Sequence, residues 1–223
     1  MIYADKIIRS KRKTVAVSLD KDGAVIIKAP KFCSDREINE ILLSSQGWLE
    51  KQLKKYNDRK EKYLGFGVKN NGKILLFGEI YEIKLCDIKS ARAEGKVLYL
   101  PERDAESALK KYLKKIAKLY FSQRIDYLSG VTSLKPSEVK VGSAKSRWGS
   151  CNAKGIINLS FYLLLCPTDI IDYVLIHEMC HLKYMNHSNA FWDEVEKYVP
   201  DYKKKRKWLK DNSEILNILK EPQ

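Results

Sequence analysis

Histidine is scarce in this chain: there are three histidines among 223 residues, and all of them lie within residues 177–187. Apolar runs are short as well. None approaches the roughly 20 residues that cross a bilayer, and no apolar segment follows Met1, so we expect no signal peptide. These absences argue against a membrane-spanning or exported protein, and we expect a cytoplasmic one.

The five cysteines are an odd number and are widely spaced. In a chain without an export signal, this pattern disfavours a disulfide framework. We therefore expect all of them to be reduced: Cys33, Cys86, Cys151, Cys166 and Cys180.

Acidic residues are outnumbered by basic ones, 28 to 42, which gives a formal net charge of +14. Such a charge favours nonspecific, salt-dependent association with nucleic acid. A lysine-rich, solvated surface explains it equally well, because lysines outnumber arginines and no nucleic-acid-binding motif is present. Both interpretations stay open.

The histidines belong to the sequence His-Glu-Met-Cys-His-Leu-Lys-Tyr-Met-Asn-His, residues 177–187. Upstream, Pro167-Thr168-Asp169 predicts the start of a helix with Thr168 as its N-cap. We expect this helix to run to about Tyr184, with its apolar residues leading into the histidine motif.

On such a helix His177 and His181 lie one turn apart on the same face, so both imidazoles can reach one metal ion. Glu178 is rotated by about a third of a turn from His177. This H-E-x-x-H spacing is typical of zinc sites in which the metal activates a water molecule and the glutamate takes its proton. Glu178 is therefore the expected catalytic residue.

The third ligand is expected to be His187, which an unbroken helix would place on a different face. A turn at Tyr184–Asn186, with Asn186 in a left-handed conformation, would return His187 to the metal. Three imidazoles leave a coordination position open, as catalytic zinc sites require. Cys180 is expected to pack behind the site. A chance H-E-x-x-H on an ordinary helix is the competing interpretation, and the third histidine argues against it.

The first hundred residues predict a small, mainly antiparallel β region with one or two helices. Strands at 14–18 and 24–28 flank the turn sequence Asp20-Lys21-Asp22-Gly23. Ser34–Glu37 is a capping box that opens a helix, and a second helix runs from Trp48 to about Lys62. Further strands are predicted at 74–77, 80–85 and 97–100. Pro101 marks the expected boundary between a region at 1–102 and a domain at 103–223.

The second half predicts a helix from Ala105 to about Leu128, ended by Gly130 and carrying a lysine-rich outer face. A strand at 138–141 follows, and the turn Asn152–Gly155 predicts a hairpin just before the histidine helix. The edge of this hairpin could hold an extended peptide, with Arg147 and Trp148 contacting side chains or packing.

A further helix is predicted after Ser188 as its cap. Phe191 and Trp192 lie early in it, and we expect them to pack against the histidine helix and hold His187 in place. The basic run 203–207 lies in a predicted surface helix.

The histidine spacing also resembles that of the metzincins, but no methionine follows His187 to form their methionine turn. The chain more closely resembles the YgjP-like metallopeptidases, which are related to the SprT-like and WLM zinc proteases. This resemblance rests on Arg147–Cys151, Asn158, the segment from Tyr173 to His181, and His187-Ser188 with Phe191-Trp192. It implies that His177, His181 and His187 bind zinc and that Glu178 is the catalytic acid/base.

The sequence therefore predicts an α+β protein, in which the β-rich N-terminal region precedes a zincin-like helical catalytic domain with a β-hairpin beside the active-site helix. The predicted function is zinc-dependent hydrolysis of peptide bonds in a protein or peptide substrate. Hydrolysis of a non-peptide substrate and nucleic-acid binding with a vestigial metal site are the alternatives. Candidate donors to the oxyanion are Arg147, Tyr184 and Tyr202.

Overall fold

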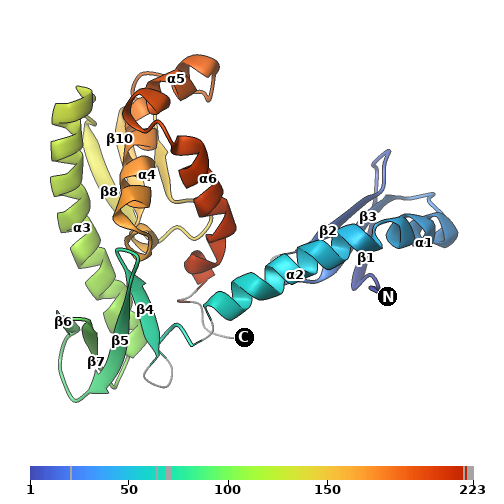
Figure 1. Cartoon of the computed structure of the whole chain (residues 1–223), viewed down its shortest axis with the longest axis horizontal. Coiled ribbons are helices and arrows are strands. Elements are labelled where there is room, and N and C mark those ends of the chain that lie inside the picture. Colours follow the sequence, from blue (N-terminus) through green and yellow to red (C-terminus); the bar gives the residue numbers. More distant parts are fainter. Residues whose placement is uncertain (21, 64, 69–71, 218, 220–223) are drawn as a thin grey trace. The chain divides into compact units, whose positions relative to one another are not determined.

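A computed structural model describes residues 1–20, 22–63, 65–68, 72–217 and 219 (Figure 1). The chain forms two compact units, Met1–Leu64 and Gly65–Gln223, and each is described by itself. In both units, runs of strands are followed by helices, so the predicted α+β class is confirmed. No helix in the described ranges is long and apolar enough to span a membrane.

The first unit begins with a three-stranded sheet in the order β1-β3-β2. The predicted hairpin is present, because β2 (Ala16–Leu19) pairs antiparallel with β3 (Val25–Pro30). In its turn, the Asp20 side chain accepts hydrogen bonds from the amides of residues 22 and 24, each at 2.9 Å; Lys21 lies outside the described residues. The sequence did not predict β1 (Lys6–Ser10), which pairs parallel with β3.

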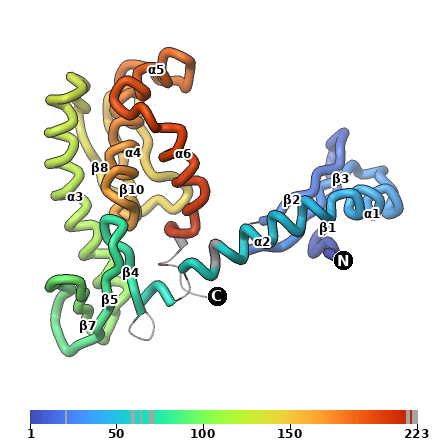
Figure 2. The backbone as a smooth tube through the Cα atoms, in the orientation of Figure 1, coloured from blue at the N-terminus to red at the C-terminus, as the bar shows by residue number. Residues whose placement is uncertain are grey.

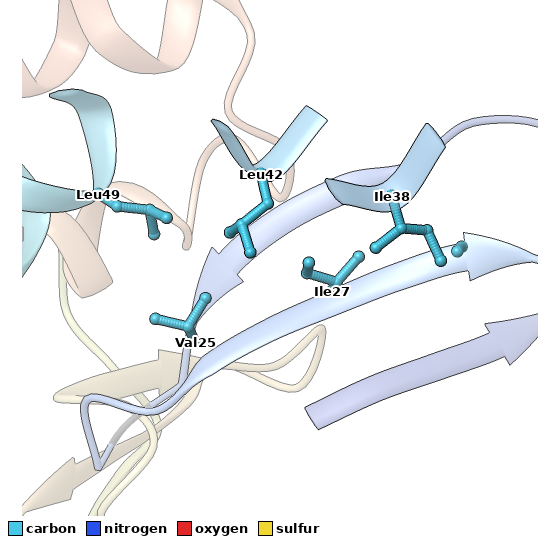
Figure 3. Close-up of a cluster of buried hydrophobic side chains, with 6 residues drawn as sticks. Val25, Ile27, Ile38, Leu42 and Leu49 are labelled. Atoms are coloured by element: carbon cyan, nitrogen blue, oxygen red, sulfur yellow. The ribbon is translucent and has the colours of Figure 1, made fainter. Parts of the chain in front are cut away.

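Two helices cover one face of this sheet. Helix α1 (Asp35–Ser44) opens with the predicted capping box, in which Ser34 and Glu37 satisfy each other's backbone amides. Helix α2 (Gln46–Lys62) follows after Ser45. Alternate apolar side chains of β3 point toward the helices and pack against apolar side chains of α1 and α2. Figure 3 shows this core, which contains Val25 and Ile27 of β3, Ile38 and Leu42 of α1, and Leu49 of α2.

The second unit begins with a four-stranded sheet in the order β4-β5-β7-β6. Antiparallel pairs join β4 to β5 and β6 to β7, whereas β5 and β7 are parallel. The short strand β6 was not predicted. The strand bounds are β4 Lys73–Leu76, β5 Glu79–Cys86, β6 Arg92–Glu94 and β7 Val97–Pro101.

The turn between β4 and β5 binds this sheet to the C-terminal half of the chain. Phe77 and Gly78 both have positive φ, 55° and 80°, as a two-residue hairpin turn requires. The Phe77 amide donates to the Leu164 carbonyl at 2.7 Å, and a Cβ at Gly78 would lie 2.9 Å from Pro167. This sheet therefore belongs to the second compact unit, Gly65–Gln223, and the domain boundary expected after residue 102 stays a prediction.

Helix α3 (Ala105–Thr132) buries one face along its whole length, at Leu109, Leu113, Ala117, Phe121, Ile125 and Leu128. Its lysines at 111, 114, 115 and 118 are exposed, as expected for a solvated face. The prediction that Gly130 ends this helix is wrong. The buried contacts of Leu128 and Thr132 continue the helix past the glycine, and Ser133 ends it in a left-handed conformation with φ of 59°.

The remaining sheet lies in the order β8-β10-β9, with β8 (Glu138–Gly142), β9 (Gly149–Cys151) and β10 (Ile156–Ser160). The predicted hairpin is the antiparallel pair β9–β10, and β8 is parallel to β10. Strand β9 is an edge strand. The buried 3-10 turn η1 (Phe161–Leu165) then leads into three helices, α4 (Thr168–Cys180), α5 (Asn189–Tyr198) and α6 (Tyr202–Asp211), and the short η2 (Ser213–Asn217).

Candidate metal centre

The histidine motif begins in the last turn of α4, a helix buried on nearly all sides, which contacts α3, α5, α6 and β9. In Figure 2, α4 lies between α3 and α6. Its start differs from the prediction by one residue. Pro167 is the N-cap, and its carbonyl accepts the amides of Ile170 and Ile171, each at 3.0 Å. Thr168 is already helical, and Asp169 lies in the first turn as expected.

Helix α4 ends at Cys180, with His181 as its C-cap, and not at Tyr184 as predicted, so the chain leaves the helix before His187. The amides of residues 183 and 184 both donate to the Cys180 carbonyl in a tight turn. The predicted left-handed Asn186 is wrong, because the non-glycine residues with positive φ in the described ranges are at 77, 104 and 133. The turn itself reverses the chain, so no left-handed residue is needed.

The three imidazoles converge. The ligand nitrogens of His177, His181 and His187 all lie within 4.8 Å of one another. The Nε2 atoms of His177 and His187 are 3.1 Å apart, close to the separation of about 3.4 Å for two nitrogens on a tetrahedral ion with bonds of about 2.1 Å. His187 is exposed, so the cluster is accessible from solvent.

The ring of His181 is oriented by a hydrogen bond of its own. Its Nδ1 donates to the carbonyl of Tyr184 at 2.9 Å, and the carbonyl can only accept. The proton of the neutral ring is thereby held on Nδ1, which leaves Nε2 with a free lone pair. The turn that ends α4 thus also selects the tautomer that a metal ligand needs.

Burial keeps His177 neutral. It lowers the pKa of this imidazole to about 3, and the positive charges of His181, His187 and Arg206 act in the same direction. The pKa of His187 is also lowered, again mainly by burial. Neutral imidazoles are the form that binds a metal ion, so the donor set suits one.

Phe191 and Trp192 of α5 enclose the imidazoles, as predicted. The Phe191 ring is fully buried, and its centroid lies 4.9, 4.5 and 4.8 Å from those of His177, His181 and His187. Trp192 stacks on His187 at 5.5 Å. The aromatic pair thus restrains all three rings, including that of His187, which is furthest along the chain from α4.

Glu178 follows His177 directly on α4 and is 6% exposed. Burial raises the pKa of its carboxyl group to about 7, and the positive charge of Arg147 opposes this rise. A Cβ at Gly149 on β9 would lie 2.8 Å from Oε1 of Glu178, so strand and carboxylate are in close contact. This role of Gly149 was not predicted, although a glycine within a strand often marks such an approach.

Cys180 is fully buried, and burial raises the pKa of its thiol to about 12, in keeping with the predicted packing role. All five cysteines are free. Among the oxyanion candidates, Arg147 is exposed and its charge acts on Glu178. Tyr202 is buried and stacks on Trp192. The assignment of an oxyanion donor stays a prediction.

The basic run on α6 is largely solvated, as predicted. Lys205 differs, because its ammonium group pairs with Asp169 of α4 at 2.5 Å and with Asp201 at 3.5 Å. Arg206 lies over the Trp192 ring, 5.0 Å from its centroid. Lys205 therefore contacts the histidine helix and Arg206 contacts Trp192, and the charge pattern alone did not indicate these contacts.

Comparison with known families assigns the class. A family model described as "YgjP-like, metallopeptidase domain" matches residues 13–212, which is most of the chain. The histidine cluster is thus the candidate metal centre of a metallopeptidase. More narrowly, the chain belongs to the YgjP-like family.

Among solved structures, the chain is similar to the metallopeptidase zymogen abylysin of Pyrococcus abyssi, with 26% identity over 40% of this chain and 90% of that one. The TM-score is 0.37, which is too low to establish a common fold. None of the curated proteins matches the chain.

Proposed function

We propose that the protein is a zinc-dependent peptidase in which His177, His181 and His187 hold the metal and Glu178 is the general acid/base. The convergence of three imidazole nitrogens within 4.8 Å beside a buried carboxylate supports this proposal most directly. An all-imidazole donor set suits zinc. When bound, zinc would polarise the scissile carbonyl and make water more acidic.

Glu178 would move the proton. Its carboxylate accepts a proton from the attacking water and passes it to the departing amine nitrogen, so that one group serves as base and then as acid. Burial raises the pKa of the Glu178 carboxyl group to about 7, so this group can both accept and donate a proton at neutral pH. The Arg147 charge keeps the anionic form accessible.

Strand β9 would bind the peptide. Trp148 and Asn152 are hydrogen-bonded to β10 through Ser160 and Ile156. In the alternation of an antiparallel pair, the intervening Gly149 and Cys151 then direct their amides and carbonyls to the open edge. An extended peptide that pairs with this edge would pass beside Glu178.

The test is cleavage of unstructured proteins by zinc-loaded protein, with Glu178→Gln as a near-isosteric control. We expect the substitution to lower turnover about 100- to 10,000-fold while zinc content stays the same. Loss of zinc binding in His177→Ala, measured by elemental analysis, would support the ligand assignment. Turnover of small esters or nucleotides without proteolysis would favour the non-peptide hydrolase instead.

Nucleic-acid association is a second candidate property, supported by the charge of +14 and the exposed lysine face of α3. It predicts DNA binding that weakens steeply with salt and survives Glu178→Gln. Fluorescence anisotropy with a labelled single strand at several salt concentrations measures it. If no DNA binding is detected even at low salt, the proposed nucleic-acid association is wrong and the lysines only form a solvated surface.

A further inference from the structure

Gly149 lies where the edge strand β9 meets the side chain of Glu178. A Cβ atom built on Gly149 would lie 2.7 Å from Cγ, 2.8 Å from Oε1 and 2.9 Å from Cδ of Glu178. All three distances are shorter than real Cβ contacts allow. The flat backbone of the glycine therefore forms the wall against which the glutamate side chain lies.

The backbone conformation does not explain this glycine. In the described part of the chain, other glycines do have positive φ, namely Gly23, Gly65, Gly67, Gly78, Gly95 and Gly155. Gly149 is not among them, and it pairs with Leu159 in a regular antiparallel register. An alanine could adopt the same backbone without strain. What excludes a larger residue is the space that Glu178 occupies.

The orientation of the Glu178 carboxylate is set mainly by packing. In the part of the chain that the structure describes, no hydrogen bond or ion pair to this carboxylate is found, although the side chain is only 6% exposed. A buried group with few polar restraints is placed by the surfaces around it. Gly149 supplies one such surface at contact distance.

We infer that Gly149 is a positioning residue, and that the absence of a side chain there keeps the Glu178 carboxylate in place beside the histidine cluster. The inference deepens the proposed function and rests on it for its catalytic meaning. The steric contact itself can be tested without any catalysis.

The activity test compares Gly149→Ala with Gly142→Ala, a matched control at the end of β8, where a Cβ would meet nothing within 4 Å. We expect Gly149→Ala to lower kcat about 100-fold, within the range of general acid–base catalysis, with KM and zinc content near wild type. Gly142→Ala should behave as wild type. Gly149→Ala with wild-type kcat would overturn the inference.

Shortening the acid provides a rescue. Glu178→Asp removes one methylene and relieves the contact with the new methyl group. We therefore expect Glu178→Asp to lower kcat by a smaller factor in the Gly149→Ala background than in wild type. Losses of kcat that simply multiply in the double variant would show that the two residues act independently, and the positioning role would then be wrong.

A stability cycle in metal-free protein separates this inference from the proposed function. Gly149→Ala should lower Tm by about 5 °C in the presence of Glu178, as an overpacked contact does, and by much less in the Glu178→Ala background. Equal losses in both backgrounds would refute the contact. If the Tm losses depend on Glu178 but the protein cleaves no peptide, the contact between Gly149 and Glu178 is supported and the proposed peptidase activity is overturned.

Discussion

The Phe191 ring contacts all three imidazoles, and Phe191→Leu tests whether it holds them in place. The substitution keeps an apolar side chain but removes the ring that lies within 4.9 Å of each histidine ring, centroid to centroid. Each aromatic contact contributes about 0.5–1.5 kcal/mol beyond its buried area. Because the three contacts share one ring, we expect metal-free protein to lose about 2–3 kcal/mol of stability.

Zinc binding should suffer in addition. Side chains that orient metal ligands typically contribute 10- to 100-fold to metal affinity, which is about 1.4–2.7 kcal/mol. At a fixed free zinc concentration, the zinc-loaded variant should therefore lose more stability than the metal-free variant. Denaturant unfolding with and without zinc measures both losses, and competition with a fluorescent chelator measures the affinity directly.

Val195→Ala is the matched control. Val195 is on the same helix, one turn further along, and is also fully buried, but it has no aromatic ring to contact the histidines. Its truncation should cost about 2 kcal/mol with or without zinc, and leave zinc affinity unchanged. If Phe191→Leu also leaves zinc affinity within twofold of wild type, the ring does not position the ligands and the reasoning is refuted.

Three further predictions concern packing and burial elsewhere in the chain. Gly78→Ala should lower its stability by about 2–3 kcal/mol in thermal unfolding, because φ is 80° and the hairpin tip is closely packed. Cys166 and Cys180 should resist a thiol reagent at pH 8 until the protein unfolds, since burial raises both pKa values and depletes the reactive thiolate, while the three half-buried thiols react. Arg124→Lys should weaken the α3–α4 contact by about 1 kcal/mol in urea unfolding, because lysine cannot reproduce the paired bonds of 2.6 and 2.7 Å to Asp172.

Local signals predicted the elements well. The capping box at Ser34 and the turn at Asp20 use hydrogen bonds between residues at most four positions apart, and both are present. The convergence of the histidines also follows from local spacing, since two lie one helical turn apart and the third follows a tight turn.

Contacts between distant residues were harder to foresee. Strand β1 pairs with β3 about 20 positions further on, and its parallel register has no turn sequence to announce it. Gly130 is a helix-ending signal by itself, but the buried residues around it continue α3. The role of Gly149 depends on Glu178, which is distant in the sequence, so the glycine alone could not indicate it.

The confinement of every imidazole to one cluster makes the centre spectroscopically distinct. The imidazole nitrogen-15 signals of the whole protein arise from these three histidines, apart from the indole signals of the four tryptophans. Because the Tyr184 carbonyl holds a proton on Nδ1 of His181, that ring should show a single tautomer in solution before any metal is added. Each step of metal loading is therefore readable in unaltered protein, ring by ring, without background from histidines elsewhere.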